Sequence, residues 1–402
     1  MNKNIFRKSK ILSAAVLMLS LAISLAAPAF AAQDIVIQDG QTTDGLNYVD
    51  VSATPGNVKV IGRADYSGNM LVMAGSGSGC EFSFYGDQLT LTFAGDTSAV
   101  SGNTKLYPRI AIYVNGERTH DFMIDSPEKT VNVVNASTPA VYTVKVLKLS
   151  EAQMSIAGIK NISVHSINNV VPTPDKNMLI EFVGDSLSCG YGVDDTAAGN
   201  VFYTSTEDVT KSYAYKTAEL LGADYSIVAF SGYGVLPGTS MLLDGDFIAP
   251  KSMLQYYERL SYSRGHIGTN VYAEAIDWDF SRQPDVIVVN LGTNDYEYIR
   301  TGADSIQDFK DYYREMLDRI MNNNPDSKIL CTLGIMGQEL CPQVEEVVNE
   351  INAGPGSRDI YTMRFDVMQA SDGLVTNGHP GEATYTKNAE QLTAKIREIM
   401  GM

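Results

Sequence analysis

Residues 178–187 read MLIEFVGDSL, an apolar run that ends in a glycine, an aspartate and a serine. A short apolar run bounded by turn residues predicts a buried strand. The glycine allows the backbone to turn, so the hydroxyl of Ser186 is exposed where the strand ends. Backbone N–H groups near the serine can then point at an oxyanion. A turn serine that only caps the next segment is the simpler interpretation, and four residues do not decide between the two.

The chain that follows this stretch alternates strand-like and helix-like patterns. Near-continuous apolar strands with helices between them predict a parallel sheet covered on both faces, which is the α/β class. Ligands of such sheets bind beyond the carboxyl ends of the strands. The apolar runs lie at 224–230, 284–292, 327–334 and 358–365, and the helical patterns at 211–222, 305–324, 342–354 and 388–400.

The chain that precedes it predicts an all-β domain over residues 33–168. Short alternating or β-branched runs such as CEFSFYG (80–86) and VYTVKVLKL (141–149) recur there, separated by turn residues. We expect a two-sheet sandwich of the jelly-roll kind. A polar linker with prolines follows at 169–177, and the α/β domain occupies 178–402.

The first 31 residues differ from the rest of the chain. Four basic residues precede an apolar run from 11 to 27, and Ala29-Phe30-Ala31 offers a small-x-small cleavage site. This pattern predicts a secretory signal peptide over 1–31, and therefore a secreted protein with no membrane attachment after cleavage. An uncleaved membrane anchor is the alternative, although the run is marginally short for a span.

The formal net charge of the chain is −17, and it becomes more negative once the basic leader is removed. Such a surface repels nucleic acid, anionic lipid and anionic polymers, so a neutral substrate is easier to reconcile with it. Solubility outside the cell is an equally good explanation. The four cysteines would permit two disulfides, but Cys189 and Cys331 resemble small buried residues. No cysteine has metal-ligand spacing, and we expect no metal.

Three further motifs follow predicted strands or precede the last helix. SGYG (231–234) places Gly232 where its N–H can approach a carbonyl oxygen, and GTND (292–295) offers the side-chain amide of Asn294 as a second donor. His379 precedes Pro380 in the last strand-to-helix loop. Each of these residues alone has a simpler explanation as a loop glycine, a turn former or a structural histidine. The order Ser, Gly, Asn, His, each at the end of a strand, is much harder to obtain by accident.

In this order, the four motifs resemble the SGNH hydrolase superfamily, and the resemblance covers residues 178–402. It implies a flavodoxin-like, three-layer α/β/α domain that carries a serine esterase. The β region ahead of GDSLSCGYG, with YTVKVLKLSEA at 142–152 and DGLVTNGHP at 372–380, is similar to carbohydrate esterase family 2. That family consists of secreted two-domain acetyl esterases, such as acetyl xylan esterases, of plant polysaccharides.

One position departs from the pattern of the superfamily. Most SGNH enzymes place an aspartate three residues before the histidine, and Thr376 occupies that position here. Members of family 2 work with a Ser–His dyad, so the absence fits the narrower resemblance. A backbone carbonyl or another group must then orient the imidazole, and Asp372 is a candidate that the sequence does not assign. Gly378 stands where relatives often carry a tryptophan, which puts that part of the substrate pocket in doubt.

The resemblance implies a mechanism that needs no metal or cofactor. His379 takes the proton of Ser186 as its Oγ attacks an ester carbonyl, and an acyl-enzyme forms. The N–H groups of Ser186 and Gly232 and the side chain of Asn294 would form the oxyanion hole. Aromatic residues near the motifs are candidates for stacking on sugar rings, and a role of Trp278 in the core or as a loop anchor remains open. These candidates are Trp278, Tyr191, Tyr233 and Tyr296.

Three functions fit this sequence. The first is removal of O-acetyl groups from a neutral plant polysaccharide, xylan or glucomannan, or from its oligosaccharides. The second is an esterase for another O-acetylated or lipid substrate, such as peptidoglycan. The third is a non-catalytic carbohydrate-binding surface protein, against which the four intact motif residues argue.

Overall fold

The computed structural model describes residues 45–239, 251–355 and 358–402. The predicted signal peptide (1–31) and the start of the predicted β domain lie outside these residues. None of the helices in the described ranges is both long and apolar enough to cross a membrane.

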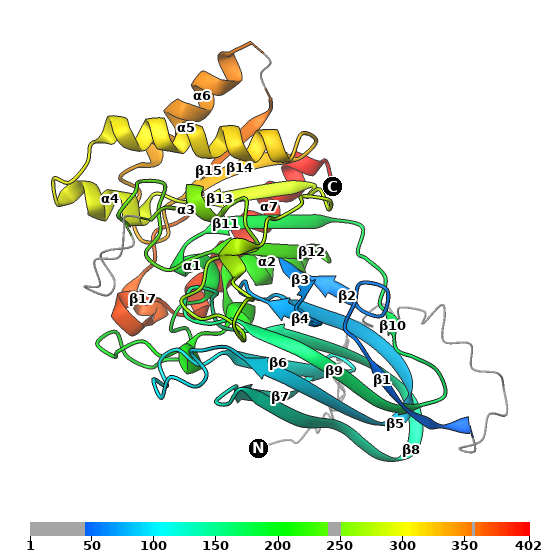
Figure 1. Ribbon diagram of the computed structural model, residues 1–402. Coiled ribbons are helices and arrows are strands. Elements are labelled where there is room, and N and C mark those ends of the chain that lie inside the picture. Colours follow the sequence, from blue (N-terminus) through cyan, green and yellow to red (C-terminus); the bar gives the residue numbers. More distant parts are fainter. Residues whose placement is uncertain (1–44, 240–250, 356–357) are drawn as a thin grey trace, which may run out of the picture. The chain divides into compact units, whose positions relative to one another are not determined.

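Within the described residues, five parallel strands form the sheet of the α/β domain, in the order β12-β11-β13-β14-β15 (Figure 1). Strand β11 pairs with β12 on one side and with β13 on the other, so the chain changes direction across the sheet at β11. Ligands of open α/β sheets bind beyond the carboxyl ends of the strands at such a switch point. The strands are β11 (Leu179–Gly184), β12 (Asp224–Ala229), β13 (Val286–Asn290), β14 (Lys328–Leu333) and β15 (Ile360–Arg364).

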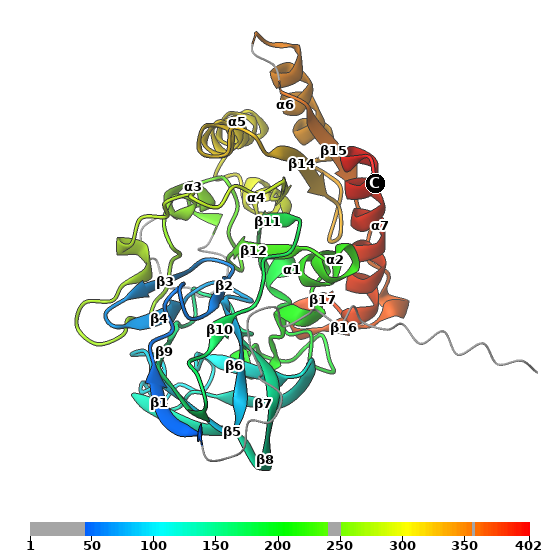
Figure 2. The same ribbon diagram turned by 90° about the vertical axis from the view of Figure 1, so that its right-hand side faces the viewer.

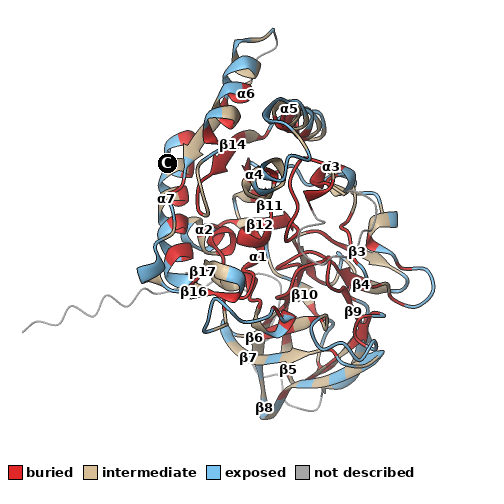
Figure 3. Cartoon of the chain, turned by 90° about the vertical axis from the view of Figure 1, so that its left-hand side faces the viewer, coloured by how far each residue is buried: buried red, intermediate tan, exposed pale blue. Residues whose placement is uncertain are grey.

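Helices cover both faces of this sheet (Figure 2). Apolar residues of α2 and α7 pack on one face, and those of α3, α5 and α6 pack on the other. The strands are buried, whereas the outer faces of α5, α6 and α7 are exposed (Figure 3). The helices are α1 (Ser186–Cys189), α2 (Tyr213–Leu221), α3 (Met253–Tyr256), α4 (Thr293–Arg300), α5 (Ile306–Asn323), α6 (Cys341–Ala353) and α7 (Glu382–Met400).

From residue 45 on, where the structure describes it, the N-terminal region forms an antiparallel sheet of ten strands. Strands β5 and β8, of 17 and 21 residues, pair along most of their lengths across bulges near Gly86 and Leu89. The first half of β5 also pairs with β2 and β10, and its second half pairs with β9. These halves enclose one apolar core. The strands are β1 (Asn47–Val51), β2 (Lys59–Ile61), β3 (Ala64–Ser67), β4 (Met70–Met73), β5 (Gly79–Gly95), β6 (Arg109–Val114), β7 (Glu117–Met123), β8 (Glu128–Lys148), β9 (Ala157–Ser166) and β10 (Val171–Pro172).

The predicted fold class is therefore confirmed: an antiparallel β region precedes an α/β region with a parallel sheet. All four cysteines are buried and free. The interpretation of Cys189 and Cys331 as small buried residues is confirmed as well.

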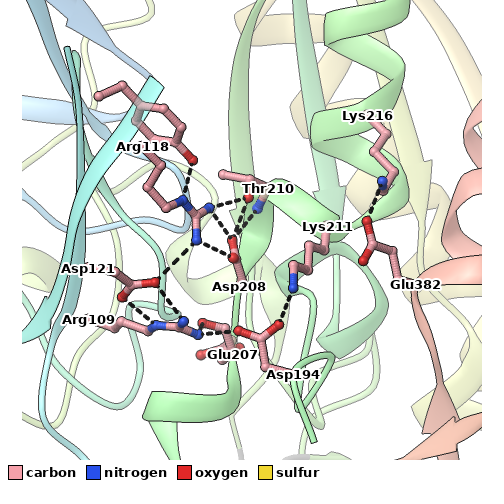
Figure 4. Close-up of polar contacts among 11 residues, drawn as sticks. Arg109, Arg118, Asp121, Asp194, Glu207, Asp208, Thr210, Lys211, Lys216 and Glu382 are labelled. Atoms are coloured by element: carbon pink, nitrogen blue, oxygen red, sulfur yellow. Dashed lines mark hydrogen bonds and ion pairs between the residues drawn. The ribbon is translucent and has the colours of Figure 1, made fainter. Parts of the chain in front are cut away.

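Ion pairs connect strands β6 and β7 to the segment between α1 and α2 (Figure 4). Arg109 Nη1 lies 2.6 Å from Asp194 Oδ2, and Arg118 Nη1 lies 2.7 Å from Asp208 Oδ2. Both arginines also contact Asp121, which lies on β7 between them in space. Because the carboxylate of Asp208 is buried and that of Asp194 largely so, water screens these pairs less than it screens exposed ones. The β region thus holds the segment that runs from α1 to α2.

Candidate active site

Ser186 lies where β11 is followed by α1, and it is the first residue of α1. The carboxylate of Asp185 caps this short helix by accepting the N–H of Leu187 at 3.0 Å. Helix α1 ends after four residues at Gly190, whose φ of +77° is in the left-handed region. The side chain of Ser186 is therefore held at the carboxyl edge of the sheet, and the residue keeps 7% of its surface exposed.

His379 faces this serine from β17 (His379–Pro380), a two-residue strand that pairs with β16 (Leu374–Val375) in the histidine loop before α7. Its Nε2 lies 2.9 Å from Ser186 Oγ, and its Nδ1 lies 3.2 Å from the backbone carbonyl oxygen of Thr376. A carbonyl oxygen can only accept, so Nδ1 carries the proton in this arrangement. Nε2 then presents a lone pair to the serine hydroxyl, which is the tautomer that a general base needs.

The carbonyl of Thr376 replaces the missing carboxylate, and Asp372 does not. The carboxylate of Asp372 pairs instead with Lys387, at 2.7 Å. Burial lowers the pKa of His379 to about 4, against a smaller effect of the hydrogen bond to Thr376, which favours the charged form. The imidazole is therefore neutral at physiological pH and able to accept a proton.

The segment after α1 holds the histidine loop in place. Thr376 Oγ1 donates to Asp195 Oδ2 at 2.6 Å, and Asn377 Nδ2 donates to the hydroxyl of Tyr191 at 3.0 Å. The ring of Tyr191 also packs against that of His379, with centroids 4.5 Å apart. A Cβ at Gly192 would lie 2.6 Å from the Cβ of Thr376, so only glycine allows this approach.

A second loop, after β12, approaches the serine from the other side. The φ of Gly232 is +79°, in the region that glycine adopts without strain. The backbone carbonyl of Ser231 accepts a hydrogen bond from Gln153 Nε2 at 2.8 Å. The backbone N–H of Ser231 donates to Glu151 Oε2, also at 2.8 Å. In a trans peptide the C=O and the next N–H point in opposite directions. Gln153 therefore fixes the direction of the Gly232 N–H, which meets no acceptor among the described residues.

Gln153 and Glu151 belong to the connection between β8 and β9, so the β region supplies this support. Both side chains are buried. Burial raises the pKa of Glu151, and the N–H of Glu151 itself donates to the buried carboxylate of Glu207 at 2.8 Å. Lys148 Nζ donates to the backbone carbonyls of Ser150 and Glu151 at 2.6 and 3.0 Å. The connection is thus a rigid element behind the Ser231–Gly232 turn.

Asn294 joins the two sides of the site. Its Nδ2 lies 2.9 Å from the carbonyl of Tyr233 and 3.2 Å from Asp185 Oδ2. The two hydrogens of the amide therefore both have acceptors, of which the carboxyl of Asp185 is the more distant. Burial raises the pKa of Asp185 to about 7, so this carboxyl is partly protonated near neutral pH and a weaker competitor for the amide hydrogen.

Comparisons with known proteins show the family of the chain. Residues 182–398 match the GDSL-like Lipase/Acylhydrolase family, and residues 60–174 match the carbohydrate esterase 2 N-terminal family. The first match covers more than half of the chain. The chain belongs to the GDSL-like lipase/acylhydrolase family. The predicted resemblance to the SGNH hydrolases and to carbohydrate esterase family 2 is confirmed.

Two curated relatives have names that describe their activities. The cellulase/esterase CelE of Acetivibrio thermocellus is 30% identical over 371 residues, which are 90% of this chain and 41% of CelE. The chain thus spans less than half the length of that relative. An acetylxylan esterase / glucomannan deacetylase of Cellvibrio japonicus is 21% identical over 87% of this chain and 91% of its own length. The expected class, a carboxylic ester hydrolase, is the class of these relatives.

Solved structures show the same two-part architecture. A family two carbohydrate esterase from Clostridium thermocellum, in complex with cellohexaose, is 28% identical and has a TM-score of 0.72 over 86% of this chain and 99% of its own. An acetyl xylan esterase from the rumen bacterium Butyrivibrio proteoclasticus has a TM-score of 0.76 over 89% of this chain and 99% of its own. At 20% identity, this second likeness shows the fold.

Within this family fold, the four aromatic residues predicted to contact sugar lie in different places. Tyr191 is buried between the rings of Phe202 and His379, and Tyr233 is buried in a cluster of aromatic rings with Tyr256 and others. Tyr296 is partly exposed on α4. Trp278 precedes β13 and therefore lies at the amino edge of the sheet, opposite Ser186. Contact of any of them with substrate stays a prediction.

Sequence reasoning missed the groups that support the site. Asp195 and Thr376 are 181 residues apart, and Gln153 and Ser231 are 78 apart, so no local pattern connects them. One signal was present: the segment YTVKVLKLSEA, which carries the resemblance to family 2, contains Glu151.

Proposed function

We propose that the chain is a serine esterase in which Ser186 is the nucleophile and His379 the general base. The observation that carries this proposal is the 2.9 Å contact between Ser186 Oγ and a neutral imidazole whose other nitrogen is committed to a carbonyl. Oγ attacks the ester carbonyl carbon while its proton passes to His379 Nε2. The proton then passes to the leaving alcohol oxygen as its bond to the acyl carbon breaks.

Deacylation repeats these steps with water. His379 Nε2 takes a proton from the water molecule that attacks the acyl-enzyme, and it returns the proton to Ser186 Oγ as the acid leaves. The N–H groups of Ser186 and Gly232 are available to the oxyanion in both steps. We propose that the oxyanion also takes the hydrogen of Asn294 Nδ2 that now points to Asp185, because that contact is the longer of its two.

The proposed substrate is acetylated neutral polysaccharide, xylan or glucomannan, in the extracellular space. Relatives named acetylxylan esterase / glucomannan deacetylase support the substrate class, and the net charge of −17 disfavours anionic polymers. The pattern of residues 1–31 supports secretion. N-terminal sequencing of protein from the culture medium should find a start after Ala31 or Ala32, and a start at Met1 would contradict it.

Acetate release from acetylated xylan, glucomannan and peptidoglycan tests this proposal. We expect release from xylan or glucomannan, and a loss of roughly 10⁴-fold or more in Ser186→Ala and in His379→Ala. Ser205→Ala, at an exposed serine of the same domain, is the matched control and should retain the rate. Release from peptidoglycan alone would overturn the substrate class. Equal rates in wild type and Ser186→Ala would overturn the mechanism.

A further inference from the structure

A cavity of about 580 Å³ lies where the β region meets the amino edge of the parallel sheet. Its lining comes from three segments: residues 55–66, residues 172–175, and the loop 277–282 that precedes β13. The Lys59 side chain in this lining binds Asp224, the first residue of β12, at 2.6 Å. Strand β11 has six residues, so roughly 20 Å separate this edge from Ser186 at the other end. The cavity is thus separate from the candidate active site.

Two aromatic residues, Trp278 and Tyr66, line the cavity, and Trp278 is the single tryptophan of the chain. The guanidinium of Arg63 lies over the indole ring, 5.2 Å from its centroid. Arg63 is itself buried and pairs with Glu181 at 3.0 Å. The indole is therefore held in place from beneath while it remains partly exposed. Such a fixed aromatic face loses little entropy when a ligand stacks on it.

The backbone of the same loop is strained. Phe280, two residues after Trp278, has a φ of +50°, a conformation that a bulky residue rarely adopts. Its ring packs against Tyr257 and beneath Arg63, with distances of 5.6 Å between the ring centroids and 5.2 Å to the guanidinium. The surrounding packing thus maintains a costly conformation that presents Trp278 at the cavity, and such strain is typical of ligand-binding sites.

Asp65 and Asp279 line the cavity, and their carboxyl groups keep oxygen atoms that can accept further hydrogen bonds, although Asp279 Oδ1 already accepts the Ser281 N–H at 2.9 Å. Burial raises the pKa of Asp65, against the effect of a hydrogen bond from the Tyr66 N–H and together with a smaller contribution from the negative charge of Asp279. Neither forms an ion pair within the described part of the chain. The cations of the lining are already engaged, because Lys59 binds Asp224 and Arg282 contacts Asp175 at 3.3 Å. Anions would meet unpaired negative charge here, whereas hydroxyl groups would find acceptors.

We propose that this cavity binds a neutral saccharide, with a sugar ring stacked on Trp278 and its hydroxyl groups donating to Asp65 and Asp279. A cation that would bind on the face of the indole is less suited, because that ring already interacts with the Arg63 guanidinium. A metal is also less suited, because the described residues contain no group of three acidic, histidine or cysteine ligands. The site goes beyond the proposed esterase reaction, and it would hold a stretch of polysaccharide at a distance from Ser186.

The fluorescence of the single tryptophan tests the proposal directly. The full chain is titrated with unacetylated cellohexaose, xylohexaose and mannohexaose, which report binding without the ester reaction. We expect a saturable change in the Trp278 emission with at least one of them, in wild type and equally in Ser186→Ala. The apparent affinity should fall at least tenfold in Tyr66→Ala and in the double variant Asp65→Asn/Asp279→Asn. Tyr48→Ala, at an exposed tyrosine of β1, is the matched control and should bind as wild type does.

Calorimetry of Trp278→Ala with the same oligosaccharides completes the test, with the thermal unfolding midpoint as a check of folding. The binding that depends on Tyr66 should be absent in this variant. The proposal is overturned if no neutral oligosaccharide changes the emission at millimolar concentration. A response to Ca²⁺ or polygalacturonate alone, or binding that all of these variants retain, would overturn it equally. A failure of the esterase assay leaves this result unaffected, so the two proposals fail separately.

Discussion

Two loops meet at Ser186, and they are held in different ways. The histidine loop is fixed by groups of the α/β region, through the Thr376 carbonyl on the imidazole and Asp195 on the Thr376 hydroxyl. The Ser231–Gly232 turn is fixed by buried side chains of the β region, Gln153 and Glu151. The side chain of His379 is thus oriented by direct contacts within the α/β region. The Gly232 N–H, on the oxyanion side of the site, is oriented by direct contacts with the β region. The β region is part of the site's architecture as well as a neighbour of it.

Among the variants that compare these two loops, loss of an oxyanion donor should reduce kcat the most. Asn294→Ala should reduce kcat by about 10²-fold, because one donor typically contributes about 3 kcal/mol to transition-state stabilisation. KM should change little. Steady-state kinetics with 4-nitrophenyl acetate measure both values, and a kcat within a factor of two of wild type would remove Asn294 from the oxyanion hole.

The pH dependence of kcat/KM tests the histidine side. Because burial lowers the pKa of His379 to about 4, the imidazole stays neutral and active at pH 5. An imidazole with the usual pKa of 6.5 would be about thirtyfold less active at that pH. The same shift makes the folded state lose stability as the pH falls from 6.5 through 4, since the unfolded chain binds the proton more tightly. An acid limb of the rate profile at 6.5 would contradict this assignment.

The oxyanion side should respond to a change in the β region. Gln153→Leu leaves the Ser231 carbonyl without its donor and frees the Gly232 N–H to turn, so kcat should fall about tenfold, less than with loss of a donor. Asn352→Leu is the matched control, because its amide also donates to a carbonyl, that of Ile360, at 2.8 Å but at the amino edge of the sheet. Both variants should lose about 1–3 kcal/mol of unfolding free energy. An equal kcat in the two would mean that Gln153 is merely structural.

The smallest effect is expected at the support of the histidine loop. Asp195→Ala removes the acceptor of the Thr376 hydroxyl, and kcat should fall about fivefold because the Thr376 carbonyl is then held less firmly against the imidazole. Asp195→Asn retains an acceptor and should recover most of the rate. Asp372→Ala, which breaks the ion pair of that carboxylate with the exposed Lys387, is the control. If Asp195→Ala and Asp372→Ala have the same rate and acid limb, Asp195 does not position the base.

The sequence predicted the elements that local pattern determines. Apolar runs and helical periodicity predicted the parallel sheet, and the motifs after β11, β12 and β13 predicted Ser186, Gly232 and Asn294 as candidate site residues. The absence of an aspartate at position 376 predicted that another group would orient His379, and that group is the Thr376 carbonyl. The buried contact of Gln153 with Ser231 could not be predicted, because the two residues lie in different regions of the chain and no sequence periodicity indicates that these regions meet. The position of Trp278 was also beyond prediction, because the sequence of its loop does not indicate at which edge of the sheet the loop lies.

Detection of the acyl-enzyme tests the central claim most directly. The full chain is quenched in acid during turnover of 4-nitrophenyl acetate, digested, and examined by mass spectrometry. We predict an acetyl group on Ser186 that is lost from the unquenched protein as hydrolysis continues, and its absence in Ser186→Ala. Hydrolysis that persists in Ser186→Ala, or an acetyl group on another residue that turns over at the catalytic rate, would contradict the account.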